Sequence, residues 1–301
     1  MIKGISALEL LHRETASTNR IKTLCGTLDK MLCGGIIIGK GIVELCGVPG
    51  SGKTLLCKLL ALNIQIPKSI GGPGLNAVYI DSEGGFSNNR LREISKSTLS
   101  YVNGKKKLED ITCESLIKNI KYIRIFDLEE LIGVLSILPG ICKNNNIGII
   151  IIDSISMLIR ICDMSKYYLH IILNNIFLDN QPYRLKMQQK IAKTLESMSK
   201  EYSLSIIVTN HMTKKYLDND QKKKKENQLT NSVIKGKYLE PSLGLSWNSL
   251  ICERLILKRE KGVIPGSEVL NIISVTNSFG EVASFKINLN GIRDYEENLI
   301  D

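Results

Sequence analysis

Long apolar runs are scarce in this sequence of 301 residues. The strongest candidate, Ile147 to Ile152, stops at Asp153, whereas a helix that crosses a bilayer needs about 20 apolar residues. An uninterrupted apolar segment is also missing near the start, where Glu9 and Glu14 fall within the stretch that a secretory signal would occupy. We therefore expect a protein that neither spans a membrane nor is secreted.

Cysteines and histidines at the short spacing of metal ligands are also missing. The 8 cysteines are scattered without a CxxC pair, and the three histidines, His12, His170 and His211, lie at no ligand spacing from a cysteine. Structural zinc sites are built from cysteine and histidine at short, regular spacing, so we expect none here. Because no secretory signal is present, we interpret the cysteines as reduced thiols of an intracellular protein.

Acidic residues are outnumbered, since 40 lysines and arginines face 30 aspartates and glutamates, for a net charge of +10 and a pI near 9.1. This excess favours a polyanionic partner, nucleic acid first and an acidic membrane surface second. A soluble protein from a lysine-rich proteome would show the same excess, and charge alone does not separate the two. The hydrophobic fraction of 43% and the charged fraction of 23% are those of a globular chain and exclude a disordered one.

Apolar strand-like runs alternate with helical stretches over most of the chain. The runs are nearly continuous in Ile, Val and Leu, which is typical of strands that are buried on both faces. The expected strands are Ile42–Cys46, Ala77–Ile80, Lys121–Phe126, Ile147–Ile152 and Leu204–Thr209, and the expected helices are Thr54–Ile64, Asn88–Tyr101, Leu128–Leu138 and Leu185–Tyr202. This order predicts one α/β domain with a mainly parallel sheet and helices on both faces.

The pattern changes after Glu240. Three further strand-like runs follow, Leu250–Lys258, Val269–Thr276 and Glu281–Leu289, and the last two are joined by a turn at Asn277–Gly280. They predict an antiparallel extension of the same sheet at the C-terminus.

Two long segments interrupt the alternation. Ser154–Arg184 is mixed in character and contains aromatic residues, whereas Thr213–Pro241 is strongly polar and contains the run Lys222–Lys225. Loops this long inside a compact domain are usually functional or disordered. Taken alone, the lysine run is interpreted as a solvated insertion, with a nuclear import signal, shared with Lys105–Lys107, as an alternative.

A glycine-rich loop carries a complete nucleotide-binding pattern. Residues Gly47, Val48, Pro49, Gly50, Ser51, Gly52, Lys53 and Thr54 fit G-x-x-x-x-G-K-[ST] without a mismatch. The loop follows a predicted buried strand and begins a predicted helix, so its backbone N–H groups and the positive helix end would face a phosphate. Lys53 would then reach the β- and γ-phosphates, and the Thr54 hydroxyl would bind Mg²⁺.

Acidic residues follow two other predicted strands. Asp153 comes directly after four isoleucines and is the candidate for the second residue on the Mg²⁺ side. Asp81 and Glu83 come just past another buried strand, before Gly84 and Gly85. Glu83 is the candidate general base that orients a water molecule. Asp81 is its competitor or its positioning partner, and a simple polar turn is the alternative to both.

Polar residues also follow the last predicted parallel strand. Asn210 and His211 lie where a γ-phosphate would be sensed, and the long polar segment begins shortly after them. Both are therefore candidate γ-phosphate sensors.

In this order and spacing, the motifs resemble the eukaryotic branch of the RecA-type recombinase family, and within that branch its C-type paralogue. The glycine-rich loop alone indicates an NTPase, whereas Asp81-Ser-Glu83-Gly84 together with Thr209-Asn210 is typical of RecA-type ATPases. The resemblance covers nearly the whole chain, from about Ser6 to Asp294. Further matching blocks are Ala7-Leu-Glu-Leu-Leu11, Leu28-Asp29 with Gly34-Gly35, Ile64-Gln65-Ile66-Pro67 before Gly71-Gly72, Leu108-Glu109-Asp110, Pro241-Ser-Leu-Gly244 with Ser246-Trp247, and Gly291-Ile-Arg293-Asp294.

The resemblance implies a RecA-like P-loop ATPase core over residues 21–301, preceded by a linker or helix over 1–20 and without the family's usual N-terminal helical domain. It implies ATP and Mg²⁺ as cofactors, with the loop from Gly47 to Leu55 at the nucleotide. Thr54 and Asp153 would bind the metal, and Lys53 and Glu83 would be catalytic.

It further implies a slow, DNA-dependent ATPase of homologous recombination and double-strand break repair, located in the nucleus. Such a paralogue binds single-stranded and junction DNA and assists filament assembly together with sibling paralogues and the main recombinase. The two irregular segments take the positions of the family's DNA-binding loops, where backbone neutralisation combines with base stacking. The candidate DNA-binding residues are Lys214, Lys215, Lys222, Lys223, Lys224 and Lys225. Where this chain has His211, the family has glutamine.

Two alternatives stay open beside this reading. A recombinase that forms its own filament would carry an exposed aromatic residue ahead of the core, and the segment before Cys25 contains no aromatic residue. A scaffold subunit would bind ATP with little hydrolysis, and it would tolerate the change Glu83→Gln, which a working ATPase would not.

Overall fold

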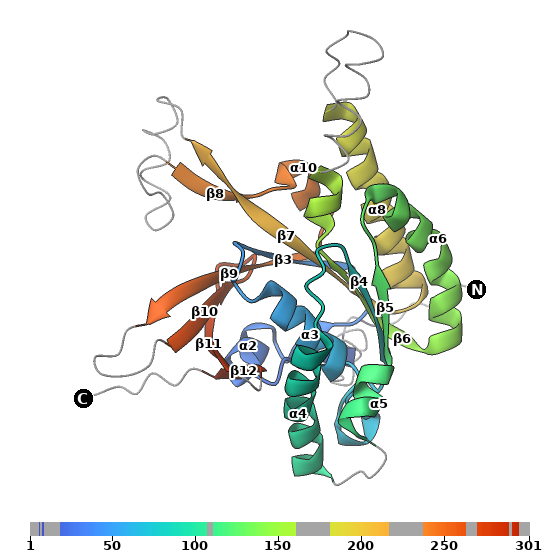
Figure 1. The fold of residues 1–301 in the computed structure, drawn as a ribbon, viewed down its shortest axis with the longest axis vertical. Coiled ribbons are helices and arrows are strands. Elements are labelled where there is room, and N and C mark those ends of the chain that lie inside the picture. The colour runs from blue at the N-terminus through green and yellow to red at the C-terminus, as the bar shows by residue number, and fades with distance from the viewer. Residues whose placement is uncertain are drawn as a thin grey trace.

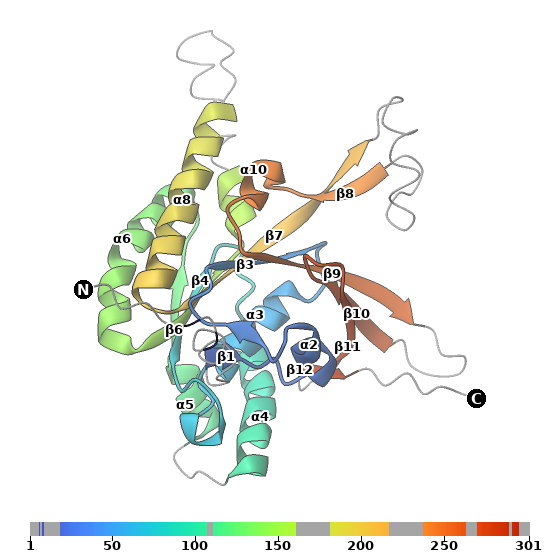
Figure 2. The same cartoon turned by 180° about the vertical axis from the view of Figure 1, so that it is seen from behind.

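The computed structural model describes residues 6, 8, 19–106, 111–160, 181–216, 237–262, 270–288 and 291–294. Most of the expected N-terminal helix, residues 161–180 of the first irregular segment and the run Lys222–Lys225 lie outside the described residues. In the described part, one large sheet carries helices on both faces (Figures 1 and 2). A separate two-stranded sheet pairs β1 (Arg20–Ile21) with β2 (Ile36–Ile37). The α/β fold predicted from the alternation is confirmed.

The large sheet is parallel over most of its width. Its strand order is β12-β11-β10-β9-β3-β7-β6-β4-β5, and each neighbouring pair from β9 to β5 is parallel. The parallel strands are β3 (Ile42–Gly47), β4 (Asn76–Asp81), β5 (Ile120–Arg124), β6 (Ile147–Asp153), β7 (Ser205–Tyr216) and β9 (Glu253–Gly262). Strands β3 to β7 are the five that the apolar runs predict, with ends that differ by one or two residues except at β7, which continues past Thr209 to Tyr216.

The C-terminal strands of the sheet are antiparallel. β10 (Leu270–Thr276) pairs with β9, β11 (Val282–Asn288) with β10, and β12 (Gly291–Asp294) with β11. The predicted extension is confirmed for these strands, but its expected first strand, Leu250–Lys258, is β9 and runs parallel to β3. The cause is β8 (Lys237–Pro241), hidden in the polar segment, which returns antiparallel along β7 so that the chain re-enters the sheet in the direction of β3.

Helices cover both faces, and the alternation of each strand decides which helices its side chains meet. One face carries α2 (Gly26–Met31), α3 (Lys53–Asn63), α4 (Asn88–Lys105) and α5 (Cys113–Lys118), and the other carries α6 (Leu128–Asn145), α8 (Gln181–Glu201) and α10 (Gly244–Asn248); η2 (Lys68–Ile70) is a short 3₁₀ helix. Along β6, Ile149 and Ile151 join the core beside α3, whereas Ile150 and Ile152 join the core beside α8. By the same alternation Asp153, at the end of β6, faces α3.

The two ends of the core meet at Asp294 of β12. Its carboxylate accepts hydrogen bonds from the backbone N–H groups of Gly26 at 2.9 Å and Thr27 at 2.8 Å, which ties the start of α2 to the last strand. None of the helices in the described ranges has the length and apolar character to cross a bilayer. Nor do His, Cys, Asp and Glu side chains in those ranges form a group of three or more that could hold a metal ion.

Candidate active site

The predicted site residues meet at the carboxyl ends of four neighbouring strands. The glycine-rich loop follows β3, Glu83 follows β4, and Asp153 ends β6. The register places Asp81 opposite Asp153, and Gly47 opposite His211 of β7. Parallel strands present their carboxyl ends at one edge of the sheet, and ligands of such folds bind there.

The glycine-rich loop has a backbone that glycine adopts without strain. Gly50 and Gly52 have φ angles of 78° and 93°. A Cβ at Gly47 would lie 2.2 Å from Ser51 Oγ, so the loop also packs closely on itself. α3 begins directly after Gly52, no described side chain caps it, and Ser51 Oγ is buried without a partner among the described residues. These unpaired donors at a helix N-terminus fit a phosphate group.

Lys53 lies along this loop. Its Nζ donates hydrogen bonds to the carbonyl oxygens of Gly47 at 2.8 Å and Val48 at 3.2 Å, and its side chain is buried. Burial lowers the pKa of Lys53, while the nearby carboxylates of Asp153 and Glu83 oppose that shift. The ammonium group is therefore held at the loop, within reach of any phosphate that the loop binds.

Asp153 is buried and oriented by two hydroxyl groups. Tyr79 Oη donates to its Oδ2 at 2.7 Å, and Thr209 Oγ1 donates to its Oδ1 at 2.6 Å. Burial and then the Asp153 charge raise the pKa of Tyr79 well above its usual range, so the phenol keeps its proton and stays a donor. Thr54, on α3, lies beside the loop that follows β4, since a Cβ at Gly85 would be 3.9 Å from its Oγ1. A hydroxyl and a carboxylate are oxygen ligands that suit Mg²⁺.

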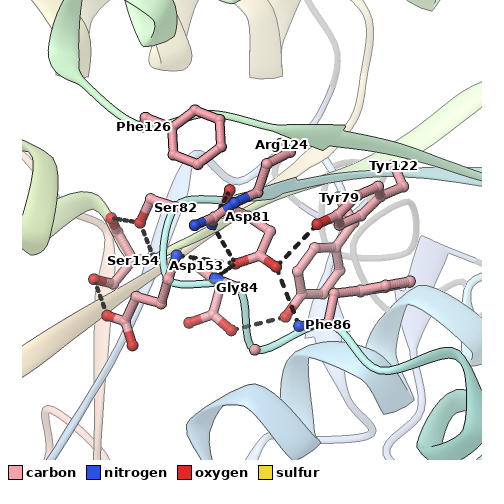
Figure 3. Close-up of polar contacts among 12 residues, drawn as sticks. Tyr79, Asp81, Ser82, Gly84, Phe86, Tyr122, Arg124, Phe126, Asp153 and Ser154 are labelled. Atoms are coloured by element: carbon pink, nitrogen blue, oxygen red, sulfur yellow. Dashed lines mark hydrogen bonds and ion pairs between the residues drawn. The ribbon is translucent and has the colours of Figure 1, made fainter.

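Asp81 organises the loop that carries Glu83, as Figure 3 shows. Its Oδ1 accepts hydrogen bonds from the backbone N–H groups of Glu83 at 3.0 Å and Gly84 at 2.7 Å, and its Oδ2 accepts from that of Phe86 at 3.1 Å. The sequence leaves Asp81 and Glu83 as competitors for the role of base. The Asp81 carboxylate is bound to backbone N–H groups and positions this loop, and the role of Glu83 as the base stays a prediction.

The edge strand β5 balances the charge of Asp81. Arg124 Nη1 lies 3.3 Å from Asp81 Oδ1 and 2.9 Å from its carbonyl oxygen, and Tyr122 Oη donates to Oδ2 at 3.2 Å. Arg124 also lies over Phe126, with its guanidinium carbon 4.7 Å from the ring centroid. A buried carboxylate is costly without such partners. Sequence reasoning missed Tyr122 and Arg124, although their spacing of two on a strand places both on one face.

Glu83 is held by two polar groups at a single oxygen. Ser154 Oγ donates to its Oε1 at 2.5 Å, and His211 Nε2 lies 2.5 Å from the same oxygen. The hydrogen bond from His211 lowers the pKa of Glu83 most, burial opposes it, and Ser154 and Lys53 lower it further, to about 2. The side chain is 31% exposed. Glu83 is thus an ionised carboxylate whose Oε2 remains able to accept a proton.

Lys58 of α3 contacts the same loop and was not among the predicted site residues. Its Nζ donates to the carbonyl oxygen of Gly85 at 2.9 Å and lies 5.8 Å from the ring centroid of Phe86. Burial lowers the pKa of Lys58, and nearby carboxylates oppose that shift. The available signal was a lysine inside an otherwise apolar helix, about one and a half turns after Lys53.

Asn210 lies on the opposite face of the sheet from His211. Its Nδ2 donates to Glu44 Oε1 at 2.8 Å, and Ser242 Oγ donates to its Oδ1 at 2.7 Å. Glu44 also pairs with Arg254 of β9, and both Asn210 and Glu44 are fully buried. The structure therefore brings His211, and not the Asn210 amide, to the site beside α3. The γ-phosphate role of Asn210 stays a prediction.

The predicted DNA-binding lysines are described only in part. Lys214 and Lys215 are exposed on β7, and Lys215 Nζ pairs with Glu240 Oε2 of β8 at 2.6 Å. Lys222–Lys225 lie outside the described residues, so the role of this loop stays a prediction.

Comparison with known proteins identifies relatives over most of the chain. The DNA repair protein RAD51 homolog 3 of Cricetulus griseus is 32% identical over 270 residues, which is 86% of this chain and 65% of the relative. The protein of the same name in Dictyostelium discoideum is 32% identical over 262 residues, 84% of this chain and 61% of the relative. The DNA repair and recombination protein RadA of Aeropyrum pernix is 33% identical over 146 residues, 48% of this chain and 42% of the relative.

The chain spans a little under two thirds of the length of both RAD51 homolog 3 proteins. The family model Rad51 matches residues 14–295, a range that includes the glycine-rich loop, the Glu83 loop, Asp153 and the C-terminal strands. From this match and from its fold, the chain belongs to the Rad51 family.

Proposed function

We propose that this chain is a recombinase paralogue that acts in homologous recombination and double-strand break repair. It binds and slowly hydrolyses ATP, binds single-stranded DNA and assists assembly of a recombinase filament. The convergence of Lys53, Asp153 and Glu83 on the N-terminus of α3 is the observation that carries this proposal. A phosphate-binding loop, an acid for the metal and an acid for the water are the parts that ATP hydrolysis needs.

The residues at the site fit ATP with Mg²⁺. Residues 47–55 would surround the phosphates, with Lys53 at the β- and γ-phosphates. Thr54 and Asp153 would hold the metal, and Tyr79 and Thr209 already fix the Asp153 carboxylate. Bound Mg²⁺ would supply charge neutralisation at the phosphate oxygens.

Glu83 is the proposed general base. Its loop is fixed by Asp81, its Oε1 is occupied by Ser154 and His211, and its Oε2 would take the proton of the attacking water. A carboxylate with a pKa of about 2 is a weak base at neutral pH, which supports slow turnover.

DNA and partner proteins enter the proposal through charge and through the relatives. The net charge of +10 supports a polyanionic partner, and binding through lysine and arginine weakens steeply as salt rises. The relatives are DNA repair proteins by name. We accordingly propose single-stranded and junction DNA, sibling paralogues and the main recombinase as partners, and the nucleus as the compartment.

The test is ATP turnover by the purified chain, with and without single-stranded DNA, in the wild type and in Glu83→Gln. We expect DNA-stimulated turnover that falls about 10²- to 10⁴-fold in the variant, because loss of a general base costs that much. ATP binding should persist, since the glycine-rich loop is intact. The matched control is Glu114→Gln, an exposed acid on α5, which should hydrolyse like the wild type. Equal turnover in wild type and Glu83→Gln would contradict the assignment.

The contacts of Glu83 also favour a second function, an ATP-binding subunit with little hydrolysis of its own. Two groups already occupy one carboxylate oxygen and weaken the base. A wild-type chain that binds ATP but shows no turnover with or without DNA would support this function. Lys53→Ala would then disturb assembly with sibling paralogues, and Glu83→Gln would not.

A further inference from the structure

The two groups that hold Glu83 Oε1 differ in how they respond to pH. The Ser154 hydroxyl keeps its proton at every physiological pH, whereas an imidazole ordinarily gains and loses a proton between about pH 5 and 8. An imidazolium at 2.5 Å from a carboxylate oxygen disfavours protonation of that carboxylate and so weakens it as a base. Loss of the ring proton removes the positive charge from His211 and leaves only a neutral contact.

Hydrogen bonds on β7 hold the backbone from which the His211 side chain projects. The N–H group of His211 donates to Ser156 Oγ at 3.1 Å, and its carbonyl oxygen accepts from the N–H group of Ser242 at 2.9 Å. The strand register also places His211 opposite Gly47, where the glycine-rich loop begins. Its side chain is 22% exposed, which leaves the ring accessible to water and to protons.

Charged groups on four other elements surround the pair. These groups are Lys53 on α3, Asp153 at the end of β6, Asp81 at the end of β4 and Arg124 on β5. Lysine and arginine ordinarily lose their protons far above pH 8, and carboxylic acids far below pH 6. Of these residue types, histidine alone ordinarily titrates near pH 7.

We propose that His211 is a positioning residue that makes ATP hydrolysis by this chain pH-dependent, because its charged ring holds Glu83 as a weak base and loss of the ring proton frees that base. This rests on the proposed ATPase function, since both concern Glu83. His211 forms no covalent bond to the nucleotide or to the attacking water, and the ring proton that it loses goes to solvent, to which the side chain is 22% exposed. The proton that Glu83 takes up comes from the attacking water.

The first experiment compares the pH dependence of turnover in the wild type and in His211→Gln at saturating ATP. Glutamine can occupy the same place and donate a hydrogen bond, but it does not titrate. Below its midpoint the wild-type rate should fall about tenfold per pH unit, as expected for one titrating group, and the rate of His211→Gln should lose that step. His12→Gln is the matched control and should keep it. ATP binding measured at each pH separates loss of hydrolysis from loss of nucleotide.

A second readout does not depend on hydrolysis. The chain has three histidines, so ring ¹⁵N resonances in a histidine-labelled sample can be assigned by single substitutions. The titration curve of the His211 ring should change when Glu83→Gln removes the neighbouring charge.

The outcomes separate this inference from the proposed function. A pH step that disappears in His211→Gln, together with a changed His211 titration in Glu83→Gln, supports the inference. Turnover with the same pH step in both proteins overturns the inference alone. No turnover at any pH in either protein overturns both the inference and the proposed hydrolysis, and the resonances then still report whether the two side chains interact.

Discussion

Two glutamates lie on opposite faces of the same sheet, and each has a nitrogen-containing partner close by. Glu44 is fully buried and pairs with Arg254 of the neighbouring strand. Glu83 is 31% exposed, and its partners are His211 and Ser154. One carboxylate therefore pairs with an arginine largely away from water, and the other lies beside a histidine within reach of water. The first arrangement favours a fixed structure, and the second leaves a side chain free to take up a proton.

Strand β7 lies between the two glutamates. Its consecutive residues Asn210 and His211 point to opposite faces, so Asn210 contacts Glu44 while His211 contacts Glu83. Neighbours in the sequence thus belong to different chemical environments. A substitution at either position tests one face of the sheet, and the comparison of the two faces becomes an experiment.

The largest expected effect comes from breaking the buried pair. Glu44→Gln should lower the free energy of unfolding by about 3 to 5 kcal/mol, because it leaves the Arg254 charge, only 16% exposed, without its partner. The double variant Glu44→Met, Arg254→Leu should recover most of that loss, since an apolar pair removes both charges. Urea unfolding of the two proteins beside Glu83→Gln measures the difference. A Glu44→Gln protein as stable as Glu83→Gln would show that the faces do not differ in this way.

The next effect concerns the acid limb of the stability curve, which is the fall in the free energy of unfolding as the pH decreases. The pKa of Glu83 in the folded chain is about 2, below its ordinary value of 4.5, so ionised Glu83 favours the folded state. That contribution is complete above about pH 4.5 and is lost as the pH falls toward 2. The unfolding free energy of the wild type should therefore fall more steeply over this range than that of Glu83→Gln. Parallel curves for the two proteins would contradict the lowered pKa.

Much of this arrangement follows from the sequence. The isoleucines from Ile149 to Ile152 fill both cores in alternation, and this doubly buried strand has to end in a polar residue at an edge, which is Asp153. The glycine-rich loop is equally explicit, because Gly50 and Gly52 adopt backbone angles that other residues disfavour. Together these local signals predict the parallel sheet and the position of the site at its carboxyl edge.

Other features depend on distant parts of the chain. β8 lies within a polar segment and forms only because β7 extends beyond the sheet and offers it a partner, and this return strand sets the direction of β9. The sequence also does not predict which face of the sheet Asn210 and His211 occupy. Strand β7 is apolar on both sides, so its alternation does not indicate which side meets α3. The contact of Arg124 with Asp81 likewise requires the pairing of β4 with β5.

The smallest effects come from removing one hydroxyl on each face. Ser242→Ala deletes the hydrogen bond to Asn210 and should lower the free energy of unfolding by about 1 kcal/mol, with the acid limb unchanged. Ser154→Ala deletes one of the two groups at Glu83 Oε1, so the pKa of Glu83 should rise toward its ordinary value and the acid limb should move to higher pH. Unfolding free energies measured from pH 7 to pH 3 report both changes in one experiment. Equal movement of the acid limb in the two variants would contradict the comparison. It would show that the buried Glu44 and the accessible Glu83 do not differ in how their contacts respond to pH.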